Sequence, residues 1–385
     1  MKNLMLHKKK ILLYTLLAIC CLFSLIFVNN DYNFYKETIV KVTTVQIVKK
    51  EKITDYYKNK DILYTQLLTG KILNGTLKGK TIELKNQYSY SGAADNQYKA
   101  GDKLFVSLDN SSINPGKNGS SEATSAISGT INGLKRDTYL VFIAVLFTIF
   151  IIAVGKKKGL FSLLSLIFNV VLFSLVMDLY LKGINLLLVC SIVVIVFTVF
   201  SLILVGGYNQ KTFTAIISTL LGTFLTLIIA YIVMKATNER GVRYEEMQFL
   251  THPPHEIFMA EILVGCLGAV MDVCITISSS IYELCETNPE LSSKALMDSG
   301  REIGKDIMGT MTNVLFFAYV SGGIPMLLVY LKNGFQTGYS FYMNLSLELI
   351  RALTGSIGIV LAIPLSLFTT VFIQQKFRKR RSLYR

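Results

Sequence analysis

The chain has 385 residues, of which 52% are hydrophobic and 17% are charged, and its mean hydropathy is +0.48. These values exclude an ordinary soluble globular protein and predict several membrane spans. The formal net charge of +14 would suit a nucleic-acid-binding protein if the chain were soluble, but Lys and Arg also collect in the cytoplasmic loops of membrane proteins, so we expect a lipid bilayer and no nucleic acid as a partner.

A basic patch at residues 7–10 precedes an apolar run at residues 11–28, which is long enough to span a bilayer. A cleaved signal peptide is the alternative interpretation. The run ends in Val28-Asn29-Asn30-Asp31, without the small residues of a cleavage site. We therefore predict an uncleaved signal-anchor helix within residues 1–28, with the N-terminus in the cytoplasm.

Residues 29–137 form the one large hydrophilic segment. Short pieces of alternating polarity at residues 62–68, 81–85 and 103–109 are separated by glycines and by an Asn-Pro-Gly turn at residues 114–116. This pattern predicts a small β domain, in the form of an OB-like barrel. A polar linker at residues 118–128 would return the chain to the bilayer.

Seven further apolar runs lie at residues 139–154, 160–181, 186–205, 213–234, 258–282, 307–331 and 345–373. Together with the signal anchor they predict a mainly α protein, a polytopic bundle of about eight transmembrane helices. The membrane domain would occupy residues 138–375, followed by a basic cytoplasmic tail at residues 376–385.

Three basic clusters set the expected orientation: residues 8–10, 156–158 and 376–381. With eight spans, all three clusters lie on the cytoplasmic side, as the positive-inside rule requires. Both termini are then cytoplasmic, and residues 29–137 are extracellular.

A carboxylate, Asp272, stands in the middle of the run 258–282. An ionisable side chain at bilayer depth costs about 2.5 kcal/mol or more, so it marks a candidate functional site. Residues three and four apart share a helix face. The face of Asp272 carries further polar or small residues, which are Glu261, Gly265, Gly268, Thr276, Ser279 and Glu283.

The next run offers a partner face of polar and small residues: Asp306, Gly309, Thr310 and Asn313, with Thr312 one position away. A carboxylate that faces Thr and Asn in a dry bundle can hold a proton or a cation. We predict that the ion is bound by Asp272, Thr276, Glu283, Thr310, Thr312 and Asn313, with support from Gly265, Gly268, Ser279, Arg301, Asp306 and Gly309. The alternative is that Asp272 is protonated and only holds helices together through hydrogen bonds.

The connector between these two runs mixes acidic and basic residues. Asn288-Pro289 resembles a helix start and Gly300 a helix stop, which predicts a short surface helix at residues 289–299. In the last run, Arg351 either pairs with Glu348 or extends outward to the membrane surface.

No metal site, cofactor or enzymatic activity is expected. The pair of histidines in His252-Pro253-Pro254-His255 lies in a loop with nonhelical spacing and without a cysteine nearby. The chain contains no Walker loop, no GxSxG and no HExxH motif.

Two stretches resemble the signature of the YibE/F-like membrane proteins. They are Gly268-Ala269-Val270-Met271-Asp272-Val273 with Ile277-Ser278-Ser279-Ser280, and Gly300-Arg301-Glu302-Ile303-Gly304-Lys305-Asp306-Ile307-Met308-Gly309-Thr310-Met311-Thr312-Asn313. The similarity extends from Ser128 to the C-terminus and, less distinctly, to residues 77–80 and 100–103. The resemblance implies a multi-span protein of the bacterial plasma membrane, but it implies no particular activity.

A weaker parallel concerns the resistance-nodulation-division group of membrane proteins. In that group a carboxylate within a span is followed by an acidic residue at its cytoplasmic end and by Thr residues in the next span. Asp272, Glu283 and Thr310 with Thr312 are similar in arrangement, whereas the two extra spans and the smaller outer domain differ.

These observations lead to two hypotheses. In the first, the protein is a permease that is driven by a proton or cation at Asp272 and moves an unknown solute, alone, as a homo-oligomer or with a membrane partner. In the second, it is an envelope accessory or assembly protein whose extracellular β domain binds a partner.

Overall fold

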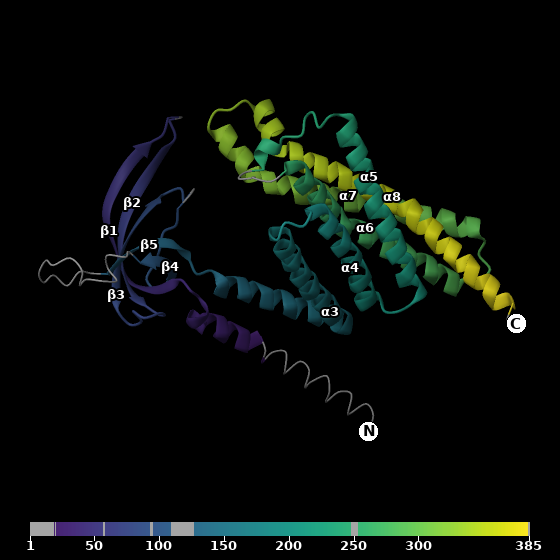
Figure 1. Ribbon diagram of the computed structural model, residues 1–385, viewed down its shortest axis with the longest axis horizontal. Helices are drawn as coiled ribbons and strands as arrows, with labels where there is room; N and C mark the ends of the chain where they lie inside the picture. Colours follow the sequence, from purple (N-terminus) through teal and green to yellow (C-terminus); the bar gives the residue numbers. More distant parts are fainter. Residues whose placement is uncertain are drawn as a thin grey trace, which may run out of the picture. The chain divides into compact units, whose positions relative to one another are not determined.

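The structure, a computed structural model, describes residues 19, 21–56, 58–92, 95–108, 127–247 and 253–383 (Figure 1). The chain divides into two compact units, residues 1–150 and residues 151–385. The first unit contains a β barrel, and the second contains most of the helices.

Five strands form the barrel: β1 (Thr38–Thr54), β2 (Lys60–Ile72), β3 (Thr81–Ser89), β4 (Lys103–Leu108) and β5 (Ile127–Leu134). They close in the order β1-β2-β3-β5-β4, with β3 and β5 parallel and the other pairs antiparallel. Alternate side chains fill the interior, because successive residues of a strand point to opposite faces. The fully buried ones include Val40, Leu68, Ile82 and Leu104.

The three predicted strand pieces lie within β2, β3 and β4, apart from residue 109, which is outside the described residues. The predicted linker is wrong at its end, because residues 127–128 already belong to β5. Glycines at positions 129 and 133 weaken the strand signal of β5. A Cβ at Gly129 would lie 2.6 Å from the backbone oxygen of Ser107, so this glycine permits the close approach of β4.

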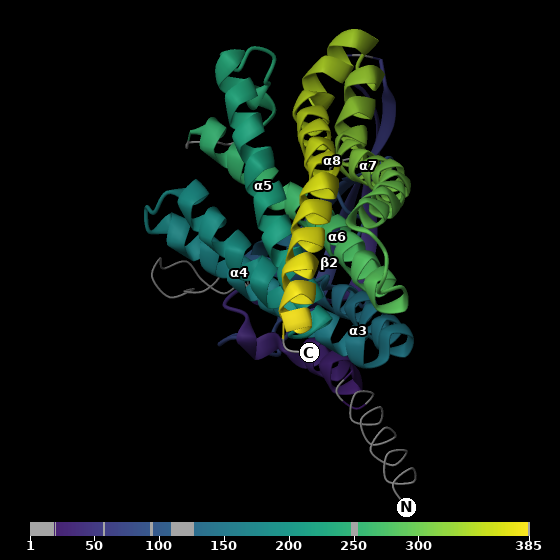
Figure 2. The same ribbon diagram turned by 90° about the vertical axis from the view of Figure 1, so that its right-hand side faces the viewer.

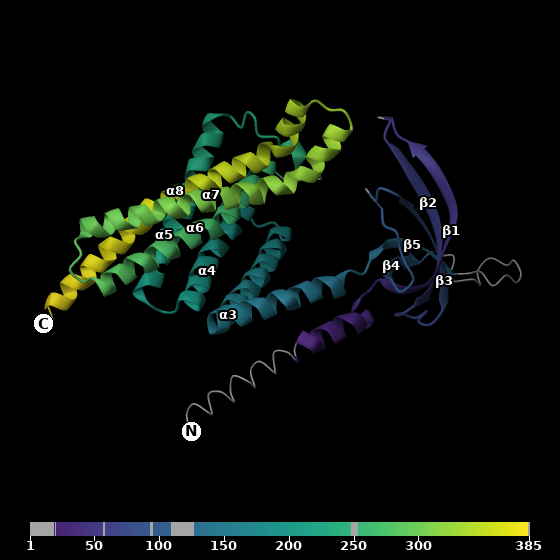
Figure 3. The same ribbon diagram turned by 180° about the vertical axis from the view of Figure 1, so that it is seen from behind.

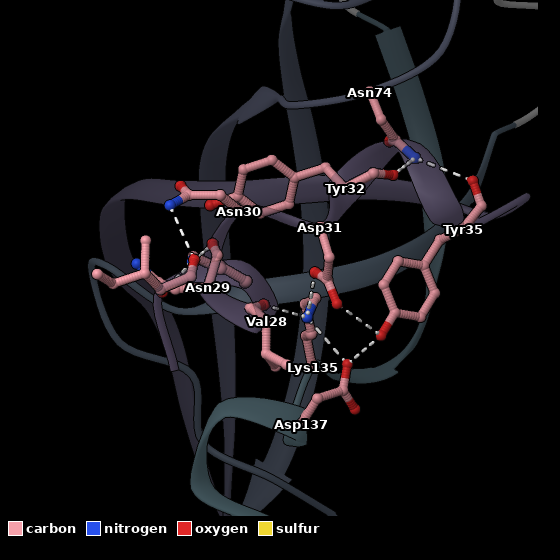
Figure 4. A network of polar contacts seen from close by, with 11 residues as sticks. Val28, Asn29, Asn30, Asp31, Tyr32, Tyr35, Asn74, Lys135 and Asp137 are labelled. Atoms are coloured by element: carbon pink, nitrogen blue, oxygen red, sulfur yellow. Dashed lines mark hydrogen bonds and ion pairs between the residues drawn. The ribbon is translucent and has the colours of Figure 1, made fainter. Parts of the chain in front are cut away.

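A network of polar contacts joins the barrel to the helices at its ends (Figure 4). The Lys135 ammonium lies 2.9 Å from a carboxylate oxygen of Asp31 and 2.9 Å from one of Asp137. It also donates to the backbone oxygen of Val28 at 3.1 Å, and only 1% of its side chain is exposed. Tyr35 donates to Asp137 at 2.5 Å. These contacts connect the helix Cys21–Asn30, the end of β5 and the start of the next helix.

Asn74 closes the same end of the barrel. Its amide oxygen accepts from the Ile39 backbone N–H at 2.7 Å, and its amide nitrogen donates to the backbone oxygens of Tyr32 at 3.0 Å and Glu37 at 2.9 Å. One buried side chain thereby satisfies backbone groups that no strand partner reaches.

Six helices in the described part of the chain are long and apolar enough to cross a membrane: α3 (Asp137–Leu181), α4 (Leu186–Gly206), α5 (Gln210–Ala236), α6 (Pro254–Thr287), α7 (Ser293–Lys332) and α8 (Thr337–Leu383). The helix Cys21–Asn30 covers only ten described residues of the predicted signal anchor. The protein is therefore mainly helical with an N-terminal β barrel, and the expected count of eight spans stays a prediction.

Helix α3 contains two of the predicted runs. Its continuity is broken at Lys156, where φ is 49° and ψ is −123°. A Cβ at Gly159 would collide with the backbone oxygen of Ile151, although eight residues of continuous helix would separate the two positions by about 12 Å. The chain thus reverses at the basic triplet 156–158, as the sequence predicted.

The predicted short helix at 289–299 is wrong, because α7 runs without interruption from Ser293 to Lys332. Ser292 is the N-cap, and its side chain accepts from the Ala295 N–H at 3.2 Å. Gly300 does not end the helix but lies inside it, where a Cβ would collide with Leu367 of α8. Its lack of a side chain serves helix packing.

Helix α6 forms the centre of the second unit and packs against α4, α5, α7 and α8. In the apolar stretch of α6, 56% of the residues are buried within the chain, whereas in the corresponding stretch of α7 only 6% are buried. Figure 2 shows α6 beside α8, and Figure 3 shows α7 and α8 side by side along much of their length. Helix α8 continues through most of the basic tail, to Leu383.

Candidate functional site

Four positions on the predicted polar face of α6 are left uncovered by the residues that the structure describes. Gly268, Asp272, Thr276 and Glu283 are exposed. The opposite face forms the core and includes Val270, Val273, Cys274, Ile277 and Ile281. Within the described part of the chain, these four positions are open to lipid, water, an ion or another protein.

Asp272 has no hydrogen bond or ion pair from its carboxylate to any residue that the structure describes. The nearest hydroxyl on its face, Thr276, donates to the backbone oxygen of Asp272 at 2.7 Å. The carboxylate thus keeps both oxygens available.

The predicted partners on α7 lie on a similarly uncovered face. Asp306, Gly309, Thr310 and Asn313 are exposed, and Thr310 donates to the backbone oxygen of Ile307 at 2.9 Å. Thr312 is partly buried, and its hydroxyl has no hydrogen-bond partner among the described residues. Since no hydrogen bond joins Asp272 to these side chains in the described part of the chain, their joint ion binding stays a prediction.

Among the supporting residues, Gly265 takes part in helix packing. A Cβ at Gly265 would collide with the hydroxyl of Tyr319 on α7, whereas one at Gly268 or Gly309 would meet nothing within 4 Å. Ser279 is partly buried. Arg301 lies 3.4 Å from Asp298 in an exposed ion pair, which contributes little to stability.

A charged trio connects α6 and α8. The Arg351 guanidinium lies 2.7 Å from Glu261 of α6 and 2.6 Å from Glu348 of α8. Of these side chains, 14% of Arg351, 40% of Glu261 and 25% of Glu348 is exposed. The buried Nε of Arg351 has no hydrogen-bond partner among the described residues, so one donor remains unused.

Two members of the trio, Glu261 and Arg351, line a cavity of about 410 Å³, a volume within the range of about 300–1,000 Å³ that is usual for small-molecule sites. Three polar side chains reach it, from α6, α7 and α8: Glu261, Tyr319 and Arg351. The remaining wall is apolar and comprises Phe173, Met177, Leu186, Cys190, Ile257, Ala260, Val264 and Gly265. Such a cavity suits an apolar solute with one polar or charged end.

The cavity and Asp272 lie along one face of α6. Glu261 and Asp272 are eleven positions apart on the helix, which places them about 16 Å apart along the axis and about 20° apart around it. Gly265 and Gly268 lie between them on the same face. The cavity thus lies at one end of the predicted polar face.

Sequence reasoning placed Glu261 on this face and left the Arg351–Glu348 pair open, but it missed the link between Glu261 and Arg351. Their separation of 90 positions carries no local signal. Opposite charges in two apolar runs were the only available hint.

Sequence reasoning also missed a hydroxyl seam between α5, α6 and α8. Ser278 lies 3.2 Å from Ser366 and 3.1 Å from Thr370, and Ser218 lies 2.5 Å from Thr369. Spacings of three and four residues in α8 were a signal for one shared face. These hydrogen bonds hold the helices together within a dry core.

Two sequence models of known families match the chain. One is described as YibE/F-like protein and matches residues 143–376, and the other is described as YibE/F family N-terminal domain and matches residues 33–129. The first match covers more than half of the chain. No curated protein and no solved structure matches.

Proposed function

Because this chain belongs to the YibE/F-like family, we propose that it is a multi-pass protein of the bacterial plasma membrane that moves a small solute across the bilayer. One observation carries the proposal: an arginine held between two carboxylates lines an open cavity among apolar helices. Charged groups in such surroundings are costly and are usually retained for function.

In the proposed topology both termini are cytoplasmic and the barrel is extracellular. The count of eight spans takes the two arms of α3 separately and adds a signal anchor before residue 29. The barrel would be OB-like, a proposal supported by its closed five-stranded order β1-β2-β3-β5-β4.

In the proposed mechanism, the solute enters the cavity beside Glu261 and Arg351, and a proton or cation binds at Asp272. Both positions lie on one face of α6, so binding at either position can change the orientation of this helix and thereby affect binding at the other. Thr276, Glu283, Thr310, Thr312 and Asn313 would complete the ion path. The protein would alternate between two conformations in which the polar faces of α6 and α7 are arranged differently, and this change would couple the movement of the ion to that of the solute.

The proposal is tested by flux measurements on the purified protein in proteoliposomes, across a panel of solutes and with a pH-sensitive dye inside the vesicles. Asp272→Asn keeps the size and hydrogen bonding of the side chain but cannot cycle a proton. We expect it to lower coupled flux at least tenfold, whereas Asp178→Asn, which changes an exposed carboxylate on α3, should leave flux unchanged. A folded Asp272→Asn protein with full flux would rule out coupling through this residue.

A second candidate function is that of an envelope accessory protein whose β domain binds a partner. It is supported by the long exposed part of β1, in which Ile47, Val48 and Ile53 are 56%, 58% and 41% exposed. Deletion of residues 36–133 separates the candidates: a simple permease would retain flux, whereas an accessory protein would lose its function.

A further inference from the structure

Strand β1 extends far beyond the part of the barrel that it closes. Its outer edge pairs with β4 only at residues 38–41, and Val42 exchanges two hydrogen bonds with Gly101 and Asp102. Its pairing with β2, in contrast, continues to Thr54 opposite Lys60. From Thr43 to Thr54, the outer edge of β1 has no strand partner among the described residues.

The register determines which backbone groups on this edge are free. Ile62, which is opposite Lys52, accepts its hydrogen bond from Tyr90, the residue directly after β3, so Lys52 and Ile62 do not bond to each other. Asp55 donates to Asn59 across the hairpin, which agrees with this alternation. Because bonding alternates along an antiparallel pair, Lys50, Lys52 and Thr54 turn their N–H and C=O groups outward, and beyond the bulge Ile47 does the same.

An open edge of twelve residues is about 40 Å long. Natural proteins usually shorten, cover or charge such edges, because they invite pairing with another chain. Here the edge is both charged and apolar, since Ile47, Val48 and Ile53 are exposed beside the exposed Lys49, Lys50 and Lys52. The charges on this edge therefore do not by themselves prevent pairing with another strand.

The charge of this segment decides which partner fits. Residues 45–60 contain five Lys residues, one Glu and one Asp, which gives a net charge of +3. A second copy of the chain would place like charges opposite each other, which is destabilising. The register places Lys50 and Lys52 on one face of the sheet and Ile53 on the other. An acidic strand would place its carboxylates beside Lys50 and Lys52 and its alternate apolar side chains beside Ile53.

We propose that the edge of β1 at residues 43–54 binds an extended acidic segment of another protein as an additional β strand. Backbone hydrogen bonds would supply most of the affinity and the side chains the specificity, as in other cases of strand addition. This inference stands apart from the transport proposal, because a barrel that recruits a partner is compatible with either candidate function.

The test uses the full-length protein in nanodiscs of uncharged lipid and a labelled ten-residue peptide of alternating Glu and Val. We expect saturable binding by fluorescence anisotropy and slower amide exchange at residues 45–54. Ile47→Pro removes one outward N–H without changing the charge and should weaken binding at least tenfold. Ile47→Ala, the matched control that keeps this N–H, should weaken it less than threefold.

Two further measurements separate strand addition from attraction to any polyanion. The same peptide with N-methyl groups on alternate residues cannot donate along one edge and should lose binding, whatever the fold of the Pro variant. Replacement of Lys49, Lys50 and Lys52 by Gln should weaken the unmodified peptide. Equal binding of the N-methylated peptide or of polyphosphate, self-association through this edge, or no exchange protection in β1 would overturn the proposal.

Discussion

Lys135 illustrates how one buried charge can fix the junction between the barrel and its helices. Its ammonium forms ion pairs with two carboxylates and lies 4.9 Å from the centre of the Tyr35 ring. Burial alone would lower the pKa of Lys135, but hydrogen bonds to Asp31 and Asp137 outweigh it and raise the pKa above its ordinary value. The lysine therefore stays charged.

Removal of this charge should destabilise the junction. Lys135→Met leaves Asp31 and Asp137 without their cation, and the loss of one partner of a buried pair costs about 3–5 kcal/mol. We expect a lower unfolding midpoint in detergent and faster amide exchange at residues 28–35. Lys99→Met, at an exposed position, is the control, and equal stability of the two variants would contradict the assigned role.

Tyr35 should make the stability of this junction depend on pH in the alkaline range. Its hydrogen bond to Asp137, followed by burial, raises the pKa of Tyr35 from 10.0 to about 12. Since the folded state holds the proton more tightly than the unfolded state, the stabilisation is complete below pH 10 and is lost as the pH rises towards 12. Unfolding midpoints between pH 9 and pH 12 should fall more steeply in the wild type than in Tyr35→Phe, and parallel curves would refute this.

At the scale of elements, glycines set how closely α5, α6 and α8 approach. A Cβ at Gly358 of α8 would lie 2.8 Å from the Thr226 hydroxyl of α5 and 3.2 Å from Val270 of α6. Gly222 of α5 packs against the same Val270, with a distance of 3.1 Å for its added Cβ. Three helices thus meet around one fully buried side chain.

Gly358→Ala should therefore destabilise the bundle by about 1–3 kcal/mol, because it overpacks this contact. Gly322→Ala is the matched control, since Gly322 is also helical and an added Cβ there would meet nothing within 4 Å. Alanine has a higher helix propensity than glycine, so the Gly322→Ala bundle should be as stable as the wild type or up to about 1 kcal/mol more stable. Denaturant unfolding in detergent checks both, and the reverse order would disprove the packing argument.

At the scale of the whole molecule, the proposed topology places the barrel outside and the connector between α6 and α7 inside. In a background without the six native cysteines, a membrane-impermeant maleimide applied to intact spheroplasts should label Lys99→Cys. Lys294→Cys, which is exposed at the start of α7, should react only after permeabilisation. The opposite labelling pattern would invert the topology.

The positions of the apolar helices and of three strands were predictable because hydropathy and alternation are local properties of the chain. The reversal in α3 was also predictable, because the lysines at 156–158 separate two apolar runs. The sequence did not predict β1, in which charges and bulges obscure the alternation, or the continuity of α7 through Gly300. In both places a tertiary contact overrides the local signal.

Hydropathy and alternation along the sequence were enough to predict helices long and apolar enough to cross a membrane, to predict a hydrophilic β domain, and to place Asp272 on a polar face of α6. Which face of each helix is covered depends on tertiary packing, because rotation about the helix axis is set by neighbours distant in the sequence. Packing turned the core face of α6 inward and left Asp272 uncovered. It also brought Glu261 to Arg351 and closed five strands into a barrel with one long open edge, since such long-range pairings have no local counterpart in the chain.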